Sequence, residues 1–131
     1  MARIEGTTRF KQYSGEYDFA VDGGAISTIV LRSNDGPIPA GSYIMSGLLE
    51  ILTAFTTASA AVAGVQAEAA NDLVASALVS GAPYSTTGLK SIIPAGTGAT
   101  AVKTTIARAP SIVIGTGTIT AGKCRLIIFF R

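Results

Sequence analysis

Turn-forming residues divide this chain into short segments, and their spacing constrains the fold more than any other feature of the sequence. Clusters such as Asp22-Gly23-Gly24, Asn34-Asp35-Gly36-Pro37 and Pro39-Ala40-Gly41 leave little room for long helices. Between the turns, apolar and polar side chains alternate, as in Tyr13 to Val21, which is the period-two pattern of a half-buried strand. The sequence therefore predicts an all-β fold.

About nine short strands are expected, at the spacing typical of a β-sandwich or barrel. The predicted strands are 13–21, 27–32, 43–52, two strands within 58–80, 89–93, 102–107, 111–114 and 123–130. The stretches 43–52 and 123–130 are apolar on both alternating faces, so we expect them to be interior strands that form the core. Ile127→Asp should then prevent soluble folding, because it would bury an unpaired charge.

The segment 58–80 carries conflicting signals. Its alanines favour a helix by propensity, whereas Val65 and Ala67 alternate with Gln66 and Glu68. Asn71-Asp72 then supplies a turn before a further apolar run. We predict two strands here.

The chain has 131 residues, which is the usual size of one domain. Residues 1–12 have mixed charge and no period, and they are interpreted as an extended arm that reaches a neighbouring subunit. Residues 13–131 are expected to form the sandwich domain. The candidate partner-binding residues are Arg3, Arg9, Phe10 and Lys11 of the arm.

Charged residues make up only 14% of the chain, against about 25% in a typical soluble domain. Too few charges remain to cover the surface, so part of its Ala, Thr, Ser and Gly area is expected to lie against other proteins. Beyond Val102 every charge is positive: Lys103, Arg108, Lys123, Arg125 and Arg131. These residues are either ordinary solvated positions or a basic surface that meets an acidic partner.

The chain contains no histidine and a single cysteine. This excludes Ser-His and Cys-His nucleophiles and a tetrahedral zinc site, and the scattered acids lack the spacing of a calcium loop. Glu50 and Glu68 could face each other as a carboxylate pair, although solvated strand positions are the alternative. Cys124 is expected to be a buried, inert thiol. We therefore expect no catalytic site, no cofactor and no bound metal.

Other ligand classes also lack support. Gly96-Thr97-Gly98 and Gly115-Thr116-Gly117 resemble pieces of phosphate loops but are interpreted as turns. The chain has no tryptophan, and its basic residues do not alternate with exposed rings, which disfavours nucleic acid. The apolar run 51–67 is interrupted by polar residues and is not a membrane span, and residues 1–10 carry charges that a secretion signal would lack.

Five short segments, each at a strand or a turn, follow one another in a characteristic order along the chain. They are Tyr17-Asp18-Phe19-Ala20-Val21, Gly41-Ser42-Tyr43-Ile44, Glu68-Ala69-Ala70-Asn71-Asp72-Leu73-Val74, Ile92-Ile93-Pro94-Ala95-Gly96 and Thr120-Ala121-Gly122-Lys123. In this order the chain resembles the small capsid decoration, or cement, proteins and minor structural proteins of tailed bacteriophages. No functional residue of that family can be assigned to a position here.

The resemblance implies a jelly-roll-like β-sandwich made in the host cytoplasm and carried on the capsid surface of the virion. The implied partners are the major capsid protein and further copies of the chain, with a trimer as the expected oligomer. The alternative is a tail- or fibre-associated receptor- or carbohydrate-binding β module. That function would require exposed rings, for which Tyr13 and Tyr84 are the candidates.

Overall fold

The computed structural model describes residues 10–92, 94 and 101–131. This part of the chain contains eight strands and a single turn of helix. The elements are β1 (Lys11–Asp18), α1 (Phe19–Asp22), β2 (Ser27–Val30), β3 (Ile44–Thr57), β4 (Val62–Gln66), β5 (Val74–Leu78), β6 (Gly88–Ile92), β7 (Ser111–Gly115) and β8 (Ile119–Phe130).

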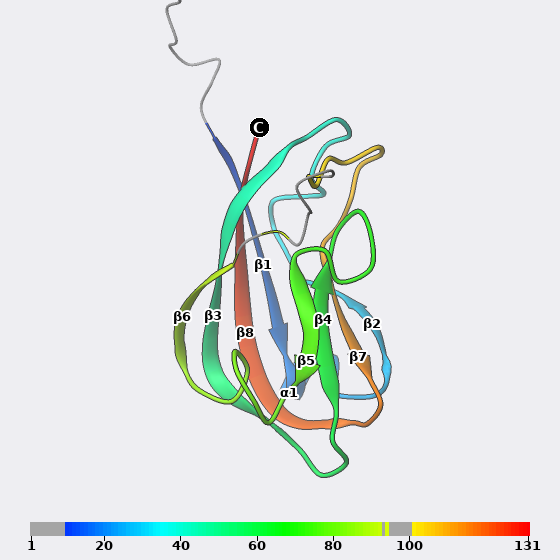
Figure 1. Ribbon diagram of the computed structural model, residues 1–131, viewed down its shortest axis with the longest axis vertical. Helices are drawn as coiled ribbons and strands as arrows, with labels where there is room; N and C mark the ends of the chain where they lie inside the picture. Colours follow the sequence, from blue (N-terminus) through cyan, green and yellow to red (C-terminus); the bar gives the residue numbers. More distant parts are fainter. Residues whose placement is uncertain (1–9, 93, 95–100) are drawn as a thin grey trace, which may run out of the picture.

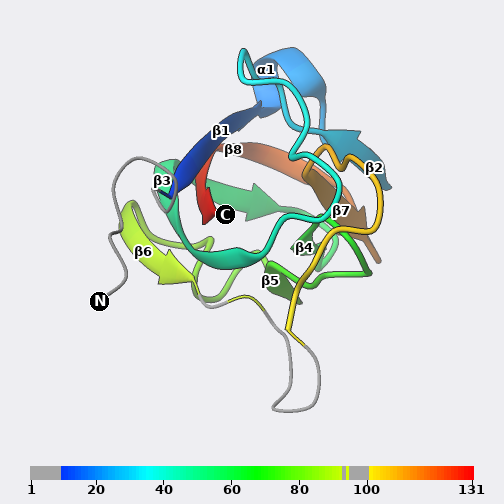
Figure 2. The same ribbon diagram turned by 90° about the horizontal axis from the view of Figure 1, so that it is seen from above.

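The strands form two four-stranded sheets, both antiparallel throughout. One sheet has the order β1-β8-β3-β6 and the other has the order β2-β7-β4-β5. Figure 1 shows the long strands β3 and β8 running the length of the molecule, and Figure 2 separates β6, β3 and β1 on the left from β2 and β7 on the right. The two sheets together have eight strands, and only β4 and β5 follow each other in the chain within the same sheet. This connectivity is that of a jelly roll. The predicted all-β sandwich is confirmed.

The core lies between the two sheets and is built from alternate residues of their inner faces. Its fully buried members include Leu49 of β3, Ile112 of β7 and Ile128 of β8. The ring of Phe55 stacks on that of Tyr17 at a centroid distance of 5.7 Å and lies 5.3 Å from that of Tyr84, which is tilted by 50°. β8 and β3 occupy the two central positions of their sheet, which confirms that both are interior strands.

Only one of the two apolar faces of β8 points into the core. Leu126, Ile128 and Phe130 point into the core, whereas Ile127 and Phe129 are half-buried on the outer face of the sheet. The expectation for Ile127→Asp was therefore placed on the wrong residue. When both alternating sets of a strand are apolar, the pattern cannot show which set faces inward.

A β-bulge also changes which residues of β3 are buried. The register between β3 and β8 shifts between Ile44 and Ser46, so that Ile44 and Leu49 both face the core although they are five residues apart. Met45, which the alternation groups with Leu49, is 49% exposed as a result.

The first predicted strand ends earlier than expected. β1 stops at Asp18, whose carboxylate accepts a hydrogen bond from the Ala20 N–H and caps the helical turn α1. Val21 is therefore 66% exposed instead of lying on a strand face. At its other end β1 begins at Lys11, within the segment expected to be the arm.

Two further expectations have opposite outcomes. Within 58–80 the chain forms β4 and β5, which pair antiparallel, so the two-strand prediction is confirmed. The predicted strand 102–107 is wrong, because this segment makes only one isolated bridge, from Lys103 to Tyr43. Its side chains form polar contacts with loops at one end of the sandwich, and these take the place of a sheet ladder.

Candidate protein-interaction surfaces

Five exposed residues from four distant parts of the chain meet where β1 and β3 begin and β8 ends. Phe10 precedes Lys11, which pairs with Phe130 in β8. The Tyr43 N–H donates to the Arg131 carbonyl at 2.8 Å, the Arg131 N–H donates back at 3.0 Å, and Tyr43 also forms a bridge with Lys103. We call Phe10, Lys11, Tyr43, Lys103 and Arg131 the basic end; Arg131 is the chain end marked C in Figures 1 and 2.

Two cations of the basic end lie against its two aromatic rings. The Lys103 Nζ is 5.2 Å from the centre of the Tyr43 ring, and the Arg131 Cζ is 5.9 Å from the centre of the Phe10 ring. Both distances are within the range of a cation–π interaction. The rings themselves are 53% exposed for Tyr43 and 59% exposed for Phe10.

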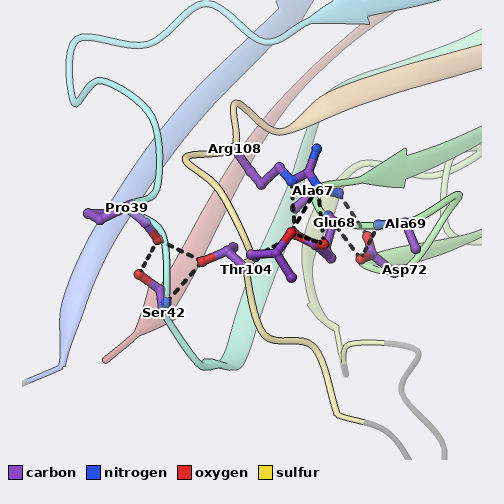
Figure 3. Close-up of polar contacts among 9 residues, drawn as sticks. Pro39, Ser42, Ala67, Glu68, Ala69, Asp72, Thr104 and Arg108 are labelled. Carbon is purple, nitrogen blue, oxygen red and sulfur yellow. Dashed lines mark hydrogen bonds and ion pairs between the residues drawn. The ribbon is translucent and has the colours of Figure 1, made fainter.

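A buried group of hydrogen bonds holds Lys103 in place. The Thr104 Oγ1 donates to the Pro39 carbonyl at 2.7 Å and accepts from the Ser42 N–H at 2.9 Å, while the Ser42 hydroxyl donates to the same carbonyl at 2.6 Å (Figure 3). Thr104 and Ser42 are buried, so these bonds compete little with water. They fasten residue 104 to the segment that leads into Tyr43.

The structure divides the basic residues of the last third of the chain into two groups. Arg108, Lys123 and Arg125 lie 2.8, 3.6 and 3.9 Å from carboxylate oxygens of Glu68, Glu16 and Glu50 respectively. Lys103 and Arg131 belong to the basic end and, like Lys11, form no ion pair within the described ranges. Three of the four cations that form no ion pair in the described part of the chain thus lie at one end of the sandwich, and the fourth, Lys90, donates to Thr86 and Thr87.

A second surface is notable for having no charge. None of the residues of β2, β7, β4 and β5 is ionisable, although these strands make up a whole sheet. On its outer face Thr28 and Gly64 lie on either side of the half-buried Val113. At its edges Val30 and Leu78 are 57% and 50% exposed. We call this surface the uncharged sheet.

Next to the uncharged sheet, two carboxylates stabilise the connection between β4 and β5. Asp72 is buried, and its two oxygens accept hydrogen bonds from the N–H groups of Ala67, Glu68 and Ala69 at 2.8, 3.1 and 2.8 Å (Figure 3). Glu68 in turn accepts from Arg108 at 2.8 and 3.1 Å and from the Thr105 N–H and hydroxyl. This group of residues joins the β4–β5 turn to the segment that carries Lys103.

The bidentate contact with Arg108, together with the Thr105 donors, lowers the pKa of Glu68 from 4.5 to about 2. The ionised form is favoured in the folded state, so this contribution to stability is complete above pH 4.5 and is lost as the pH falls towards 2. We expect Glu68→Gln to lower the melting temperature at pH 7 and to flatten its decline between pH 5 and 3. Thermal unfolding followed by circular dichroism at several pH values measures both effects.

Glu50→Gln is the matched control, because the Glu50 carboxylate is 3.9 Å from Arg125 in a single exposed contact. Its melting curve should follow that of the wild type at every pH. Parallel acid profiles for wild type and Glu68→Gln would contradict the assignment of the pH dependence to Glu68.

The predicted partner-binding residues have different outcomes. Arg3 and Arg9 lie outside the described residues, and Phe10 and Lys11 belong to the basic end. Sequence reasoning missed Tyr43, which was assigned to the core because the bulge after Ile44 cannot be seen in the pattern. The only sequence signal for Lys103 and Arg131 was the basic composition of the last third of the chain.

The candidate residues for chemistry, Glu50, Glu68 and Cys124, are separated or buried. Glu50 lies in β3 and Glu68 follows β4, so they belong to different sheets and each faces an arginine. Burial raises the pKa of the Cys124 thiol to about 12, which leaves it unreactive. Within the described ranges there is no group of three acidic or cysteine residues that could hold a metal ion.

The motif at 115–117 has the geometry of a turn and not of a phosphate loop. Thr116 has a positive φ of 67° and a Cβ at Gly117 would overlap the Ser59 carbonyl, so Gly115-Thr116-Gly117 is a turn; Gly96-Thr97-Gly98 lies outside the described residues. A depression of about 310 Å³ beside β1 is lined by arginine side chains as well as carboxylates, and this mixture favours no single charged ligand.

None of the helical structure in the described part of the chain is long enough to span a membrane.

Comparison with known proteins gives matches at the level of structure alone. No protein-family model matches the chain, and no curated protein is similar to it in sequence. A chain in the structure of the cyanophage Pam1 capsid asymmetric unit aligns with a TM-score of 0.67 and 14% identity, over 99% of this chain and 91% of that one.

Two other solved structures align over similar lengths. A chain of the capsid of Ralstonia phage GP4 has a TM-score of 0.62 and 14% identity, over 99% of this chain and 89% of its own. A chain of the acid-stable capsid of Helicobacter pylori bacteriophage KHP30 has a TM-score of 0.62 and 11% identity, over 94% and 87%. At such low identity these likenesses show that the fold is shared.

Proposed function

We propose that this chain is a structural protein of a phage virion that binds the outside of the capsid shell and stabilises contacts between major capsid protein subunits. The observation that carries the proposal is the fold: it matches chains from three phage capsid structures over at least 94% of this chain. Matches that span at least 87% of each aligned chain indicate that the sandwich fold, and not only one motif, is shared. Synthesis in the host cytoplasm and a final location on the virion surface belong to the proposal.

The surface of the sandwich supports a role in protein association. A complete sheet without ionisable residues carries no desolvation penalty for buried charge when a protein covers it. We assign the uncharged sheet to contacts between copies of the chain, in a trimer. Three linked copies make the second and third shell contacts effectively intramolecular, so modest interfaces suffice for firm binding.

Residues 1–9 are included in the proposal as an arm that binds a neighbouring subunit, through Arg3 and Arg9. The last residue before β1, Phe10, is 59% exposed and belongs to the basic end. The chain therefore enters the sandwich at a surface where a partner can be reached. A segment that binds a neighbouring subunit in this way adds contact area to that of a small domain.

The test is decoration of empty shells of the phage that encodes the chain, prepared without this protein. Purified wild-type protein should bind at saturable sites, and image reconstruction should place three copies per site on the outer surface. Deletion of residues 1–9, which leaves β1 complete, is expected to lower the occupancy at equal protein concentration. Shells that take up no wild-type protein would refute the function, and unchanged occupancy after the deletion would refute the role of the arm.

The competing receptor- or carbohydrate-binding function required exposed rings at Tyr13 and Tyr84, and these rings are buried. Tyr13 is only 2% exposed and Tyr84 is fully buried, so neither ring can form a binding platform. The exposed rings, Tyr43 and Phe10, each have a cation over one face. No specific feature of the described residues favours this function over attachment to a shell.

A further inference from the structure

We propose that the basic end is the face with which the sandwich docks, and that it binds a carboxylate-rich surface of the coat subunits. This inference deepens the proposed function and rests on it. It assigns shell binding to Lys11, Lys103 and Arg131, with Tyr43 and Phe10 as the rings that hold two of these cations in place.

Charge complementarity identifies the kind of partner. Arg108 and Arg125, which lie elsewhere on the sandwich, each have a carboxylate oxygen within 3.9 Å and are already paired. Lys11, Lys103 and Arg131 are exposed, lie on adjoining segments, and have no ion pair in the part of the chain that the structure describes. Such a cluster attracts a negatively charged surface and accelerates encounter with it.

The arrangement of the cations favours protein carboxylates over nucleic acid. One face of each ring is occupied by a cation, which leaves less ring surface on which a base could stack. The guanidinium of Arg131 has several N–H donors in one plane, and two of these match the two oxygens of a carboxylate. Three cations also neutralise few phosphates, so binding to duplex DNA would be weak at physiological salt.

The basic end is held in its binding geometry before any partner arrives. Buried hydrogen bonds of Thr104 with Pro39 and Ser42 fix the segment that carries Lys103. Two backbone hydrogen bonds between Tyr43 and Arg131 fix the other side of the cluster. Groups ordered in advance lose less conformational entropy on binding, so a small charged surface can contribute substantial affinity.

The test compares two double variants with the same net charge. Lys103→Gln/Arg131→Gln lowers the formal charge from +2 to zero by removing two cations of the basic end. Ala25→Glu/Ala58→Glu also reaches zero, but with exposed residues near Ile119, at the opposite end of β8. Both variants should melt like the wild type, because all four side chains lie outside the core.

Binding to the empty shells is then measured over a range of salt concentrations. We expect the basic-end variant to bind about tenfold more weakly or worse and to lose most of its salt dependence. The opposite-end variant should bind like the wild type, and Lys103→Arg/Arg131→Lys should restore binding. If wild type and the basic-end variant bind equally well, this inference is overturned while the proposed function stands; if the wild type does not bind, the proposed function itself fails.

Two further probes check the class of partner. A labelled DNA duplex and vesicles containing phosphatidylglycerol should show no binding at physiological salt. Binding to either probe at the strength seen with shells, and its loss in the basic-end variant, would overturn the assignment to protein carboxylates.

Discussion

Ile128→Asp is expected to abolish soluble folding of this protein. Ile128 is fully buried in β8, the strand that lies between β1 and β3 and pairs with both. A carboxylate at this position would lie among apolar side chains with no cationic partner, which costs about 5 kcal/mol or more. Because small domains are stable by only about 5–15 kcal/mol, most of the population should unfold and aggregate. Expression yield in the soluble fraction and circular dichroism measure the outcome.

Ile127→Asp provides a control with the same chemical change at the adjacent residue. Ile127 is half-buried on the outer face of the sheet, beside Ser14 and Leu48, where an aspartate keeps contact with water. This variant should remain soluble and melt cooperatively, a few degrees below the wild type. A folded Ile128→Asp together with an unfolded Ile127→Asp would show that the two faces of β8 are assigned the wrong way round.

Asp72→Ala is expected to destabilise the fold by about 3 kcal/mol, because three N–H groups lose a charged acceptor at once. These groups belong to Ala67, Glu68 and Ala69 in the tight connection from β4 to β5, and the Asp72 side chain is the acceptor that all three share. For a domain of this size the melting temperature should fall by roughly 10 °C. Urea unfolding at pH 7 gives the free energy directly.

Two variants make the Asp72 measurement specific. Asp72→Asn keeps the shape of the side chain but replaces one acceptor oxygen with a donor, so its effect should be intermediate. Asp35→Ala removes a carboxylate that accepts a single exposed bond from the Ser14 N–H at 2.7 Å, and should cost less than about 1 kcal/mol. Equal losses of unfolding free energy for Asp72→Ala and Asp35→Ala would mean that the buried contacts of Asp72 stabilise the fold no more than a single exposed hydrogen bond does.

The basic end shows why an interaction surface of this kind escapes sequence reasoning. Its members come from positions 10–11, 43, 103 and 131. The pairing of β1, β3 and β8 and the bridge between Tyr43 and Lys103 bring these positions together. The positive composition of the last third of the chain was visible, but three of its five cations lie beside glutamates. Which cations remain available for a partner depends on these long-range pairings.

The fold class followed from local chemistry, which acts between neighbouring residues. Turn residues such as Asp22-Gly23-Gly24 interrupt the chain, and alternating side chains between them suit a sheet with one buried face. The same logic resolved 58–80 into β4 and β5 against their helical alanine content, because the alternation around Gln66 and the turn at Asn71 agreed. Period and turn chemistry are properties of short segments, so the sequence by itself determined the all-β sandwich and the approximate positions of most strands.

Only the tertiary structure decided which side of each strand is buried. β8 has apolar residues on both faces, and Ile128 rather than Ile127 points inward because β3 and β1 pair with β8 in one particular register. The bulge at Ile44 and the loss of a strand at 102–107 likewise depend on partners far away in the chain. Burial and pairing are collective properties of packed sheets, and a local pattern with two equivalent faces contains no information about which one the rest of the molecule will cover.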